Sequence, residues 1–311
     1  MENDRLPYIS VIITAYNRKE FLLKAITSAV NQTLDKKYYE IIVIKNFTDQ
    51  NIDEFINENN IKHIIMEGTM GEFLNKGITE ANGEIISFLD DDDLFLENKL
   101  DVVYKKFKKD NNVVYYHNLC VPININGKLV SINNMHIAPY ANKSSISIKK
   151  CIVKINKTNN ITAADDPLVY LYALESNKKI IKGKEKLTYY MLHDSASTIV
   201  SNNFEEYRKI VITQLDLHLN NYISFNNLFH SRKAINFLNS RITDTQIYMY
   251  TFGANQIPNK LVNYILNSSD SLEYRAKLSL AYILIKVYPK SRTYIRNKIW
   301  NNHKKLVNEV I

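Results

Sequence analysis

The sequence predicts an α/β fold in residues 1–200, with a mostly parallel sheet flanked by helices, and a mainly helical region in residues 201–311. In the first part, apolar runs rich in β-branched residues alternate with segments of helical periodicity. The runs have no polar alternation, so both faces of the sheet are expected to be covered. From about residue 204 onward, helical periodicity continues without a strand-like run of comparable strength. A domain boundary is therefore expected near residue 200.

Strands and helices alternate along the first part of the chain. The expected strands are the apolar runs at residues 8–14, 40–44, 61–66 and 84–89. The helices expected between and after them cover residues 19–31, 52–56, 71–81 and 97–108. The first of these helices has its apolar residues on one stripe, and Asn17 is a candidate cap for it. Asn82-Gly83 is expected to end the third helix.

Residues 113–192 have a mixed pattern. Asn126-Gly127 lies between two extended runs, a combination typical of a β-hairpin. Further on, Asp165-Asp166-Pro167 precedes a helical pattern. Because proline is favoured at the first helical position, Asp166 is expected to be the cap of that helix.

The composition is that of a globular protein with a basic surface. The 311 residues are 45% hydrophobic and 23% charged, with a formal net charge of +8. A positive surface suits nucleic acid, an anionic membrane or phosphorylated small molecules, but no recognisable nucleic-acid-binding motif is present, so no nucleic-acid partner is expected. The two cysteines, Cys120 and Cys151, lack CxxC spacing, which argues against a structural zinc site or a disulfide framework and favours a reducing compartment. With no signal-peptide pattern and no run of about 20 apolar residues, the chain is expected to be cytoplasmic.

Two polar segments directly follow expected strands: residues 14–17 (TAYN) and the acidic run Asp90–Asp93. In an open parallel sheet, ligands bind beyond the carboxyl ends of the strands, where both segments are expected to lie. Neighbouring carboxylates repel, and each makes ionisation of the next less favourable. A bound Mg²⁺ or Mn²⁺ ion, which prefers oxygen ligands and often also binds substrate phosphates, offsets this repulsion. The alternative is a solvated acidic loop that caps the helix beginning near Glu97.

Three stretches follow one another in a specific order: YISVIITAYNRKEFLLKAITSAVNQTL, then EIIVIKNFTD, then GEFLNKGITEANGEIISFLDDDDLFLENKL. In order, spacing and chemistry they resemble family 2 glycosyltransferases of the GT-A fold. The resemblance covers roughly residues 7–108 and extends more loosely to about residue 200. It implies a Rossmann-like GT-A sheet and an inverting enzyme that uses a nucleotide-diphospho-sugar donor.

The resemblance assigns the nucleotide to the ends of the first two strands. Thr14, Ala15 and Tyr16 match the family positions that meet the base and the ribose. The family usually has two acids after the second strand, the second of which contacts the base, whereas this chain has Lys45 and Asn46. Asn46 is still expected to pair with a base edge, because its amide is both donor and acceptor, but the replacement removes the basis for expecting uracil. Lys45 is expected either to be solvated or to face a phosphate.

In the acidic run, Asp90-Asp91-Asp92 matches the DxD-type motif of the family. The resemblance places Asp91 or Asp90 on the ribose side of the donor. It makes Asp92 the ligand of the Mn²⁺ or Mg²⁺ ion that bridges the diphosphate and neutralises charge on the leaving group. Asp93 either belongs to this site or caps the next helix.

Two later segments also resemble family motifs. The family's catalytic base is the second acid of a pair at the start of a helix, which corresponds to Asp166; the alternative role of Asp166 is the helix cap alone. Tyr189–His193 resembles a Tyr-x-x-His segment that closes over the donor diphosphate, so His193 is expected to contact phosphate or metal, the alternative being a loop histidine with neither role. The QxxRW motif of processive relatives is absent, which favours addition of a single sugar.

Most of the excess positive charge lies in residues 271–311, where nine basic residues stand against Glu273 and Glu309. The apolar run at 279–288 is too short to span a bilayer, and Trp300 follows it. This combination suits helices that lie on an anionic membrane surface, which would favour a lipid-linked acceptor and a peripheral location on the cytoplasmic membrane face. The alternative is a helical bundle with a solvated basic face that packs on the catalytic domain or forms a homo-oligomer interface.

The sequence therefore predicts a metal-dependent glycosyltransferase of the hexosyltransferase type, acting on a hydroxyl of a lipid-linked or polysaccharide glycan. The alternative is a non-catalytic sugar-nucleotide-binding or scaffold protein on the same fold. Lys45-Asn46 is the best support for that alternative, while Asp92 and Asp166 argue against it. The sugar, the base, the linkage and the oligomeric state are not defined by the sequence.

Overall fold

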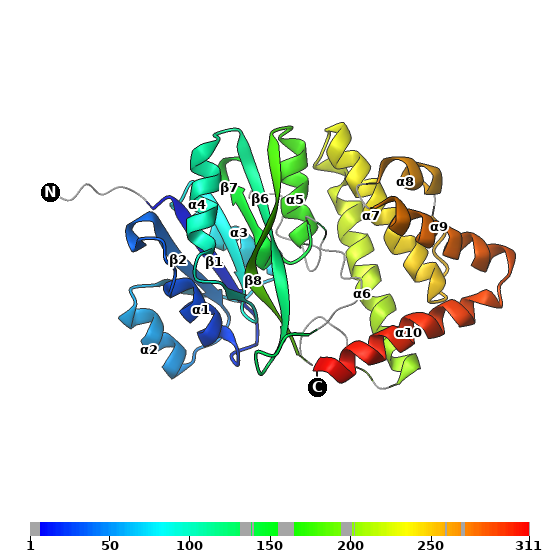
Figure 1. Cartoon of the computed structure of the whole chain (residues 1–311), viewed down its shortest axis with the longest axis horizontal. Coiled ribbons are helices and arrows are strands. Elements are labelled where there is room, and N and C mark those ends of the chain that lie inside the picture. The colour runs from blue at the N-terminus through cyan, green and yellow to red at the C-terminus, as the bar shows by residue number, and fades with distance from the viewer. Residues whose placement is uncertain are drawn as a thin grey trace. The chain divides into compact units, whose positions relative to one another are not determined.

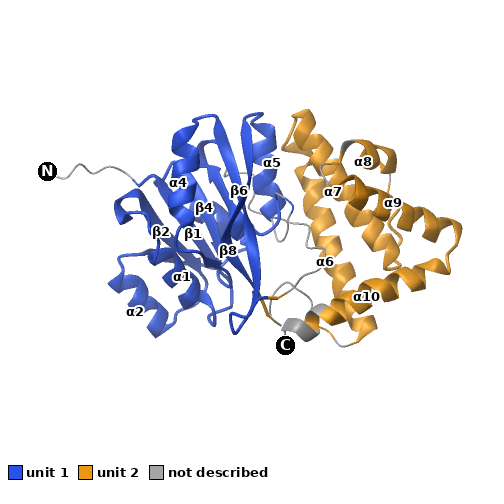
Figure 2. Ribbon diagram, viewed as in Figure 1, with its two compact units in different colours: residues 1–129, 134–191 blue, residues 130–133, 192–311 orange. Residues whose placement is uncertain are grey.

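The computed structural model describes residues 7–130, 138, 140–154, 165–193, 201, 203–258, 260–268 and 271–310. The chain divides into two compact units, one of residues 1–129 and 134–191 and the other of residues 130–133 and 192–311 (Figure 2). The first unit holds a sheet with helices, and the second is helical (Figure 1). The predicted α/β fold followed by a mainly helical region is confirmed.

The first unit is built on an eight-stranded sheet with the strand order β3-β2-β1-β4-β7-β6-β8-β5. The parallel half consists of β1 (Ile9–Ala15), β2 (Tyr39–Lys45), β3 (Lys62–Ile65) and β4 (Ile85–Asp90), and each of these strands matches a predicted one. The other half contains antiparallel pairs and consists of β5 (Leu94–Phe95), β6 (Val113–Asn124), β7 (Ile146–Lys149) and β8 (Lys179–Leu192). The alternation of strands and helices did not foresee this half.

Helices cover both faces of the sheet. On one face, α1 (Leu22–Val30), α2 (Gln50–Glu58) and α4 (Lys99–Lys109) share an apolar core with alternate residues of β1, such as Val11 and Ile13. On the other face, α3 (Met70–Glu80) packs so closely that a Cβ on Gly77 would lie 2.5 Å from Cγ2 of Ile12. The period of two along a strand thus separates the two cores.

The expectations for local turns and caps have mixed outcomes. The predicted turn at Asn126-Gly127 is confirmed: Gly127 has φ 74° and its N–H donates to Asn124 O at 2.8 Å. Asn17 does not cap α1, because the helix begins at Leu22 and Asn17 lies earlier, with a left-handed φ of 54°. Asp166 is not the cap of α5 (Asp165–Glu175), because the helix already includes Asp165. Both carboxylates lie in its first turn, where they suit the positive end of the helix dipole.

The described residues of the second unit form five α-helices: α6 (Phe204–Ser224), α7 (Arg232–Thr251), α8 (Leu261–Asn267), α9 (Leu272–Val287) and α10 (Ser291–Val310). One apolar cluster joins α7, α8 and α9 through Ile247, Tyr264 and Tyr282. A second, aromatic cluster places the Tyr207 ring 4.9 Å from that of Trp300. In the part of the chain that is described, no helix is long and apolar enough to cross a membrane.

The C-terminal helix differs from the predicted basic and aromatic surface. Trp300 is buried, and the guanidinium groups of Arg292 and Arg296 lie over the rings of Tyr250 and Phe204, at 4.7 Å and 5.8 Å from the ring centroids. These cation–π contacts hold α10 on α6 and α7. Arg292, Arg296 and Trp300 therefore belong to the packing of the second unit rather than to a free surface.

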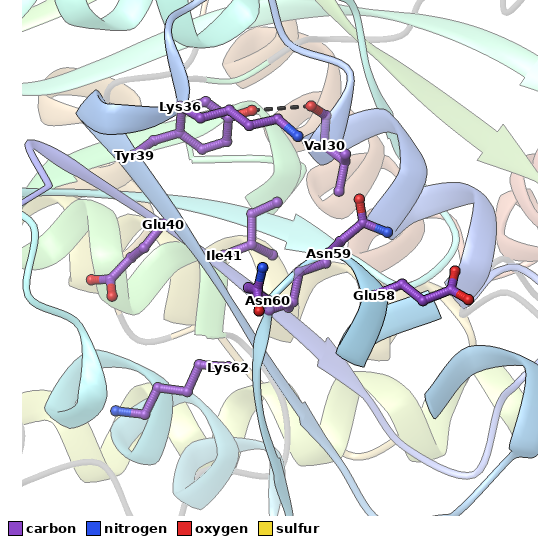
Figure 3. Close-up of a pocket in the computed structure, with 10 residues that line it drawn as sticks. Val30, Lys36, Tyr39, Glu40, Ile41, Glu58, Asn59, Asn60 and Lys62 are labelled. Carbon is purple, nitrogen blue, oxygen red and sulfur yellow. Dashed lines mark hydrogen bonds between the residues drawn. The ribbon is translucent and has the colours of Figure 1, made fainter. Parts of the chain in front are cut away.

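A cavity of about 430 Å³ lies at the amino ends of β2 and β3 (Figure 3). Its lining includes Tyr39 and Glu40 at the start of β2, Lys62 at the start of β3, and Glu58 at the end of α2. Because the predicted ligand segments follow the carboxyl ends of the strands, this cavity is at the wrong end of the sheet to be their binding site.

Candidate functional site

The turn after β1 and the acidic run after β4 lie side by side. The two strands are parallel neighbours, and Thr14 stands opposite Asp90 in their register. Both segments therefore leave the sheet at the same edge, where an open α/β sheet binds its ligands. The structure brings Thr14, Tyr16 and the acids of residues 90–93 together at this carboxyl edge.

A third segment reaches the same edge through antiparallel pairing. Ser87 of β4 pairs with Ser147 of β7, so three residues further along β4 Asp90 is level with Ser144. The N–H of Asp90 donates to Ser144 Oγ at 2.9 Å, which agrees with this register. Ser144 belongs to a buried 3₁₀ turn, Lys143–Ser145, which directly precedes β7. The antiparallel pairing of β7 with β4 thus positions Lys143 next to the acidic run.

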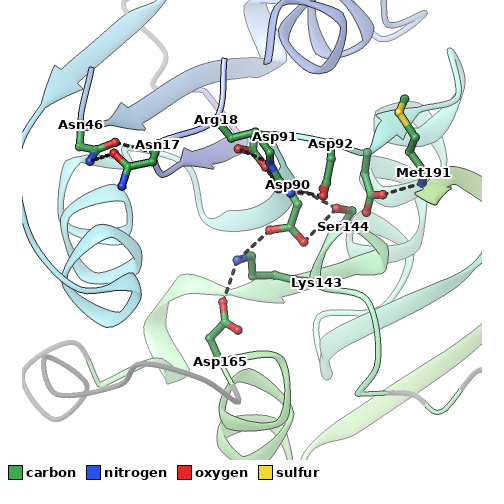
Figure 4. Close-up of polar contacts among 11 residues, drawn as sticks. Asn17, Arg18, Asn46, Asp90, Asp91, Asp92, Lys143, Ser144, Asp165 and Met191 are labelled. Carbon is green, nitrogen blue, oxygen red and sulfur yellow. Dashed lines mark hydrogen bonds and ion pairs between the residues drawn. The ribbon is translucent and has the colours of Figure 1, made fainter. Parts of the chain in front are cut away.

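Lys143 lies between two carboxylates that are distant in sequence (Figure 4). Its Nζ is 2.8 Å from Asp90 Oδ1 and 2.7 Å from Asp165 Oδ2, and its side chain is only 4% exposed. Burial disfavours the charged amine, but the charges of Asp165, Asp90 and Asp166 outweigh it, and the pKa of Lys143 is raised well above its ordinary value. Lys143 therefore stays charged and links the end of β4 to the start of α5.

Arg18 makes the corresponding contact with the middle of the acidic run. Its Nε donates to Asp91 Oδ2 at 3.1 Å, Nη2 also donates to Asp91 Oδ1, and Nη2 lies 2.8 Å from Asp92 Oδ2. Burial raises the pKa of Asp91 to about 6 even though the Arg18 guanidinium acts against this rise. A metal ion is therefore not needed to explain how this run tolerates its own repulsion, because Arg18 and Lys143 supply two positive charges.

Asp93 has a different surrounding from the other three acids. It is 1% exposed, and its Oδ1 accepts a hydrogen bond from the N–H of Met191 in β8 at 3.1 Å. Burial, with Asp92 and Asp90 nearby, raises the pKa of Asp93 well above its usual range. The expectation that Asp93 caps the next helix is wrong, because α4 follows Asn98 and has no side-chain cap. Through this hydrogen bond, Asp93 instead links the turn after β4 to β8.

The two acids at the start of α5 have opposite electrostatic properties. The Asp166 carboxylate accepts a hydrogen bond from the backbone of Lys143, yet burial and the charges of Asp165 and Asp90 raise its pKa well above the usual range. For Asp165, the effect of burial is outweighed by the ion pair with Lys143, and its pKa is lowered. Adjacent carboxyl groups whose pKa values are pushed apart are typical of sites that transfer protons. Of the two, Asp166 has the affinity for a proton that a general base requires.

The predicted nucleotide positions at the end of β1 and directly after it differ in exposure. Ala15 is buried, whereas Tyr16 is 46% exposed and its ring packs edge-on against Phe73 of α3 at 5.8 Å. The hydroxyl of Thr14 is buried and makes no hydrogen bond with any residue that the structure describes. A buried hydroxyl without a partner is unfavourable, so Thr14 is suited to a ligand that bonds to it.

Asn46 directly follows β2, is half-buried and pairs with the turn after β1. Its Nδ2 donates to Asn17 Oδ1 at 2.8 Å, and its Oδ1 accepts from the N–H of Asn17 at 2.8 Å. Lys45, by contrast, is fully buried; its Nζ is 2.6 Å from Asp53 Oδ1 of α2 and donates to Phe47 O at 2.7 Å. Both expectations for Lys45, solvation and contact with a phosphate, are therefore wrong. Its charge is used to hold the loop after β2 against α2.

His193 directly follows β8 and belongs to the second unit. It is buried. Its predicted contact with the donor phosphate or a metal stays a prediction.

Two residues of the site, Arg18 and Lys143, are absent from the predictions made on the sequence. Arg18 could have been predicted from the sequence, since it directly follows TAYN in the turn that was expected at the ligand-binding edge. No sequence pattern indicated Lys143, because its position in the site depends on the antiparallel register of a four-residue strand.

The acidic run meets only part of the requirement for a metal site. Within the described ranges, no group of three or more His, Cys, Asp and Glu side chains is placed to hold an ion. Asp92 does offer a hard carboxylate, and its side chain is 15% exposed. Mg²⁺ commonly binds one or two carboxylates together with substrate phosphates and water. The residues present thus fit an ion that binds together with a diphosphate, provided that Arg18 gives up its contact with Asp92.

The sequence and the fold both have known counterparts. The model of glycosyl transferase family 2 matches residues 10–159. An uncharacterized glycosyltransferase of Rickettsia bellii is 38% identical over 133 residues, which make up 40% of this chain and 19% of that protein. The poly(ribitol-phosphate) beta-glucosyltransferase of Bacillus spizizenii is 26% identical over 258 residues, or 70% of this chain and 40% of that protein. The chain thus spans less than half the length of these curated relatives.

A solved structure extends the likeness to almost the whole chain. A mannosyltransferase from Pyrobaculum calidifontis, in complex with GDP-Man and Mn²⁺, has a TM-score of 0.53 at 13% identity, with 98% of this chain and 86% of that chain covered. At this identity, the likeness shows the fold alone. The family match itself covers the strands and acids of the carboxyl edge and confirms the predicted resemblance: residues 10–159 of the chain belong to glycosyl transferase family 2.

Proposed function

We propose that the protein is an inverting glycosyltransferase that moves one sugar from a nucleotide-diphospho-sugar to a hydroxyl of a polysaccharide or lipid-linked glycan. One observation carries the proposal: the acids after β4 and the acid pair of α5 meet at the carboxyl edge, joined through Lys143. The carboxylates that we propose to bind the donor thus lie near Asp166, whose pKa is raised. The Bacillus relative, whose name specifies a polymeric acceptor, supports an acceptor of the glycan class.

The donor nucleoside is proposed to lie over the ends of β1 and β2. Thr14 offers a hydroxyl without a partner among the described residues, Tyr16 an exposed ring, and Asn46 an amide held in place by Asn17. An aromatic ring stacks on any base, and an amide pairs with a base edge as donor and acceptor. Asp91, or Asp90, would bind the ribose.

The diphosphate is proposed to lie against Asp92. A Mn²⁺ or Mg²⁺ ion held there would neutralise the negative charge that grows on the diphosphate as the bond to the sugar breaks. Asp92 and Arg18 are already paired, so the guanidinium and the ion compete for the same carboxylate. The mannosyltransferase from Pyrobaculum, whose structure contains Mn²⁺ and GDP-Man, supports this cofactor class.

Asp166 is proposed to be the general base. It would take the proton of the acceptor hydroxyl while the hydroxyl oxygen forms the bond to the anomeric carbon and the bond from that carbon to the diphosphate breaks. A base with a raised pKa binds this proton more strongly, which favours transfer from the hydroxyl. The backbone N–H of Lys143 holds the Asp166 carboxylate in place.

The donor class is tested by thermal unfolding with UDP-, GDP- and dTDP-sugars, each with and without Mn²⁺. A ligand that binds only the native state raises its stability, by about 2.7 kcal/mol at 100 times its Kd. We expect one nucleotide class to raise the Tm, and to raise it more with Mn²⁺. The anomeric configuration of the product, determined by NMR, then tests inversion. If no sugar nucleotide changes the Tm at millimolar concentration, the donor site is disproved.

Lys143→Met is expected to move the acid limb of the pH–rate profile to higher pH. Burial and the charges of Asp165 and Asp90 raise the pKa of Asp166, and the Lys143 cation acts against them. Without the cation, Asp166 keeps its proton to a higher pH, so less base is available at neutral pH. The pH dependence of transfer at saturating donor measures the effect, with Lys143→Arg as the matched control that keeps the charge.

Stability has to be separated from this electrostatic effect. Removing one member of a buried ion pair destabilises a protein by roughly 3–5 kcal/mol. Adding Asp165→Asn to Lys143→Met removes the uncompensated partner and should restore part of the lost Tm. A folded Lys143→Met protein with the wild-type pH profile would contradict the role of Lys143.

The buried position of Lys45 weakens the competing view that the chain only binds sugar nucleotides. The replacement of two acids by Lys45 and Asn46 was its best support, and of these two residues Lys45 is now accounted for by its pair with Asp53. At Lys45, the departure from the family pattern therefore concerns the packing of α2.

A further inference from the structure

Helix α9 is apolar on two opposite faces. Leu278, Tyr282 and Ile285 are buried, and two of them belong to the cluster that joins α7, α8 and α9. The other face is exposed yet also apolar: Leu280 is 62% exposed, Ile283 44%, Leu284 49% and Val287 78%. A helix that is apolar all round is normally buried on all sides or in contact with lipid.

The exposed residues form one continuous stripe. Positions 280, 283, 284 and 287 follow the three- and four-residue spacing of one helix face. Tyr288, which is 57% exposed, extends the stripe beyond the end of the helix. These five residues (Leu280, Ile283, Leu284, Val287 and Tyr288) are called the α9 face below. Contiguous apolar surface of this kind on a protein marks an interaction site more often than chance exposure.

Basic residues surround the α9 face. Lys277, Lys286 and Lys290 are exposed, and the one acid on the exposed side of α9, Glu273, pairs with Lys277. Lys286 and Lys290 make no ion pair with any described residue. An apolar stripe bordered by lysines without an ion-pair partner is complementary to a layer that has an apolar interior and a negatively charged surface.

We propose that the α9 face binds an anionic lipid surface, with α9 lying in the plane of the membrane. Such helices bury their apolar face about 5–10 Å into the headgroup region while their lysines contact the lipid charges. A second copy of the chain is a poorer partner, because a two-fold axis through this face would bring the same lysines together. Arg292 and Arg296 of α10 are not part of the proposal, since they pack on Tyr250 and Phe204. The inference does not depend on the proposed sugar transfer.

The test is flotation of the full chain with vesicles of phosphatidylcholine alone and of phosphatidylcholine with phosphatidylglycerol. The apolar variant is Leu280→Gln/Leu284→Gln/Val287→Gln, which leaves the net charge and the buried face unchanged. The charge variant is Lys286→Glu/Lys290→Glu. Its matched control, Lys178→Glu/Lys184→Glu, makes the same change in charge at exposed lysines of the first unit.

We expect the wild type and the matched control to float only with anionic vesicles. Because each basic residue near an anionic surface contributes about 1 kcal/mol, the charge variant should lose on the order of 10- to 100-fold in partitioning. The apolar variant should lose a similar factor, and high salt should weaken binding of the wild type. Circular dichroism and thermal unfolding confirm that each variant is folded.

Three outcomes would overturn the proposal. The first is that the wild type does not float with anionic vesicles. The second is that folded α9 variants float as well as the wild type. The third is a wild-type dimer in light scattering that becomes monomeric in the apolar variant without any vesicle binding, which would make the α9 face an interface between copies of the chain.

Discussion

Asp166→Asn is expected to bind the donor as well as the wild type and to transfer sugar about 10²-fold more slowly, or worse, which is the scale of a lost general base. The amide keeps an oxygen that accepts the Lys143 backbone hydrogen bond, but it cannot take a proton from the acceptor. Calorimetry with the donor and a transfer assay on the same preparation separate the two effects. A change in KM for the donor without a change in kcat would instead indicate a binding role.

The pH dependence gives a second readout of the same residue. Burial and two neighbouring carboxylates raise the pKa of Asp166 well above its ordinary value, so the base is protonated and inactive over a wider acidic range. The rate of transfer by the wild type should therefore increase with pH around that raised pKa, which lies well above the range in which an exposed carboxyl titrates. This pH-dependent increase should be absent in Asp166→Asn. If the variant keeps both the rate and the pH-dependent increase, Asp166 only stabilises the start of α5 and the base lies elsewhere.

β3 lies at the edge of the sheet and is partly exposed, but the other three strands of the parallel half were predictable because they are buried on both faces. Such strands are uninterrupted apolar runs, and amphipathic helices separate them. The antiparallel half was not, because β5 has two residues and β7 has four, too few for a periodic pattern. Their places are defined by partners distant in sequence: Tyr189 lies opposite Leu94, and Ser147 opposite Ser87.

The same distinction applies to the candidate site. The acids of residues 90–93 were placed at the carboxyl edge because they directly follow a predicted strand. Their counter-charges were not found, since Lys143 reaches Asp90 only through the register of β7. Lys45 was misjudged because a lysine is buried only when it is paired, and its partner Asp53 lies on the next helix.

The charge of the C-terminal region was counted correctly from the sequence but not correctly placed. A sum over residues 271–311 treats every base as exposed, whereas Arg292 and Arg296 lie on aromatic rings of the same unit. Side chains of arginine stack on aromatic faces more readily than those of lysine. The bases that remain at the surface of α9 and after it are lysines, Lys286 and Lys290 among them.

Asp92→Ala is expected to abolish the Mn²⁺-dependent part of donor binding and to lower transfer on the order of 10²- to 10³-fold, the scale of losing one group that stabilises developing charge. The fold should persist, because Asp92 is partly exposed and Arg18 keeps its two hydrogen bonds to Asp91. Calorimetric titration of donor with and without Mn²⁺ measures the change. Unchanged donor affinity with unchanged dependence on Mn²⁺ would exclude Asp92 as a ligand.

Arg18→Met is expected to have the opposite effect on Mn²⁺ binding from Asp92→Ala. It distinguishes a role of Asp92 as a metal ligand from a role in the ion pair with Arg18 alone. Because the guanidinium of Arg18 lies 2.8 Å from Asp92 Oδ2, it must yield that oxygen before a metal ion can take it. Removing the guanidinium should therefore strengthen Mn²⁺ binding to the protein. Calorimetry or Mn²⁺ electron paramagnetic resonance, both without any donor, measures this binding. Adding Asp92→Ala to Arg18→Met should abolish the increase in affinity. If Arg18→Met weakens Mn²⁺ binding or leaves it unchanged, Arg18 and the ion do not compete for Asp92, and the carboxylate serves the ion pair with Arg18 rather than a metal.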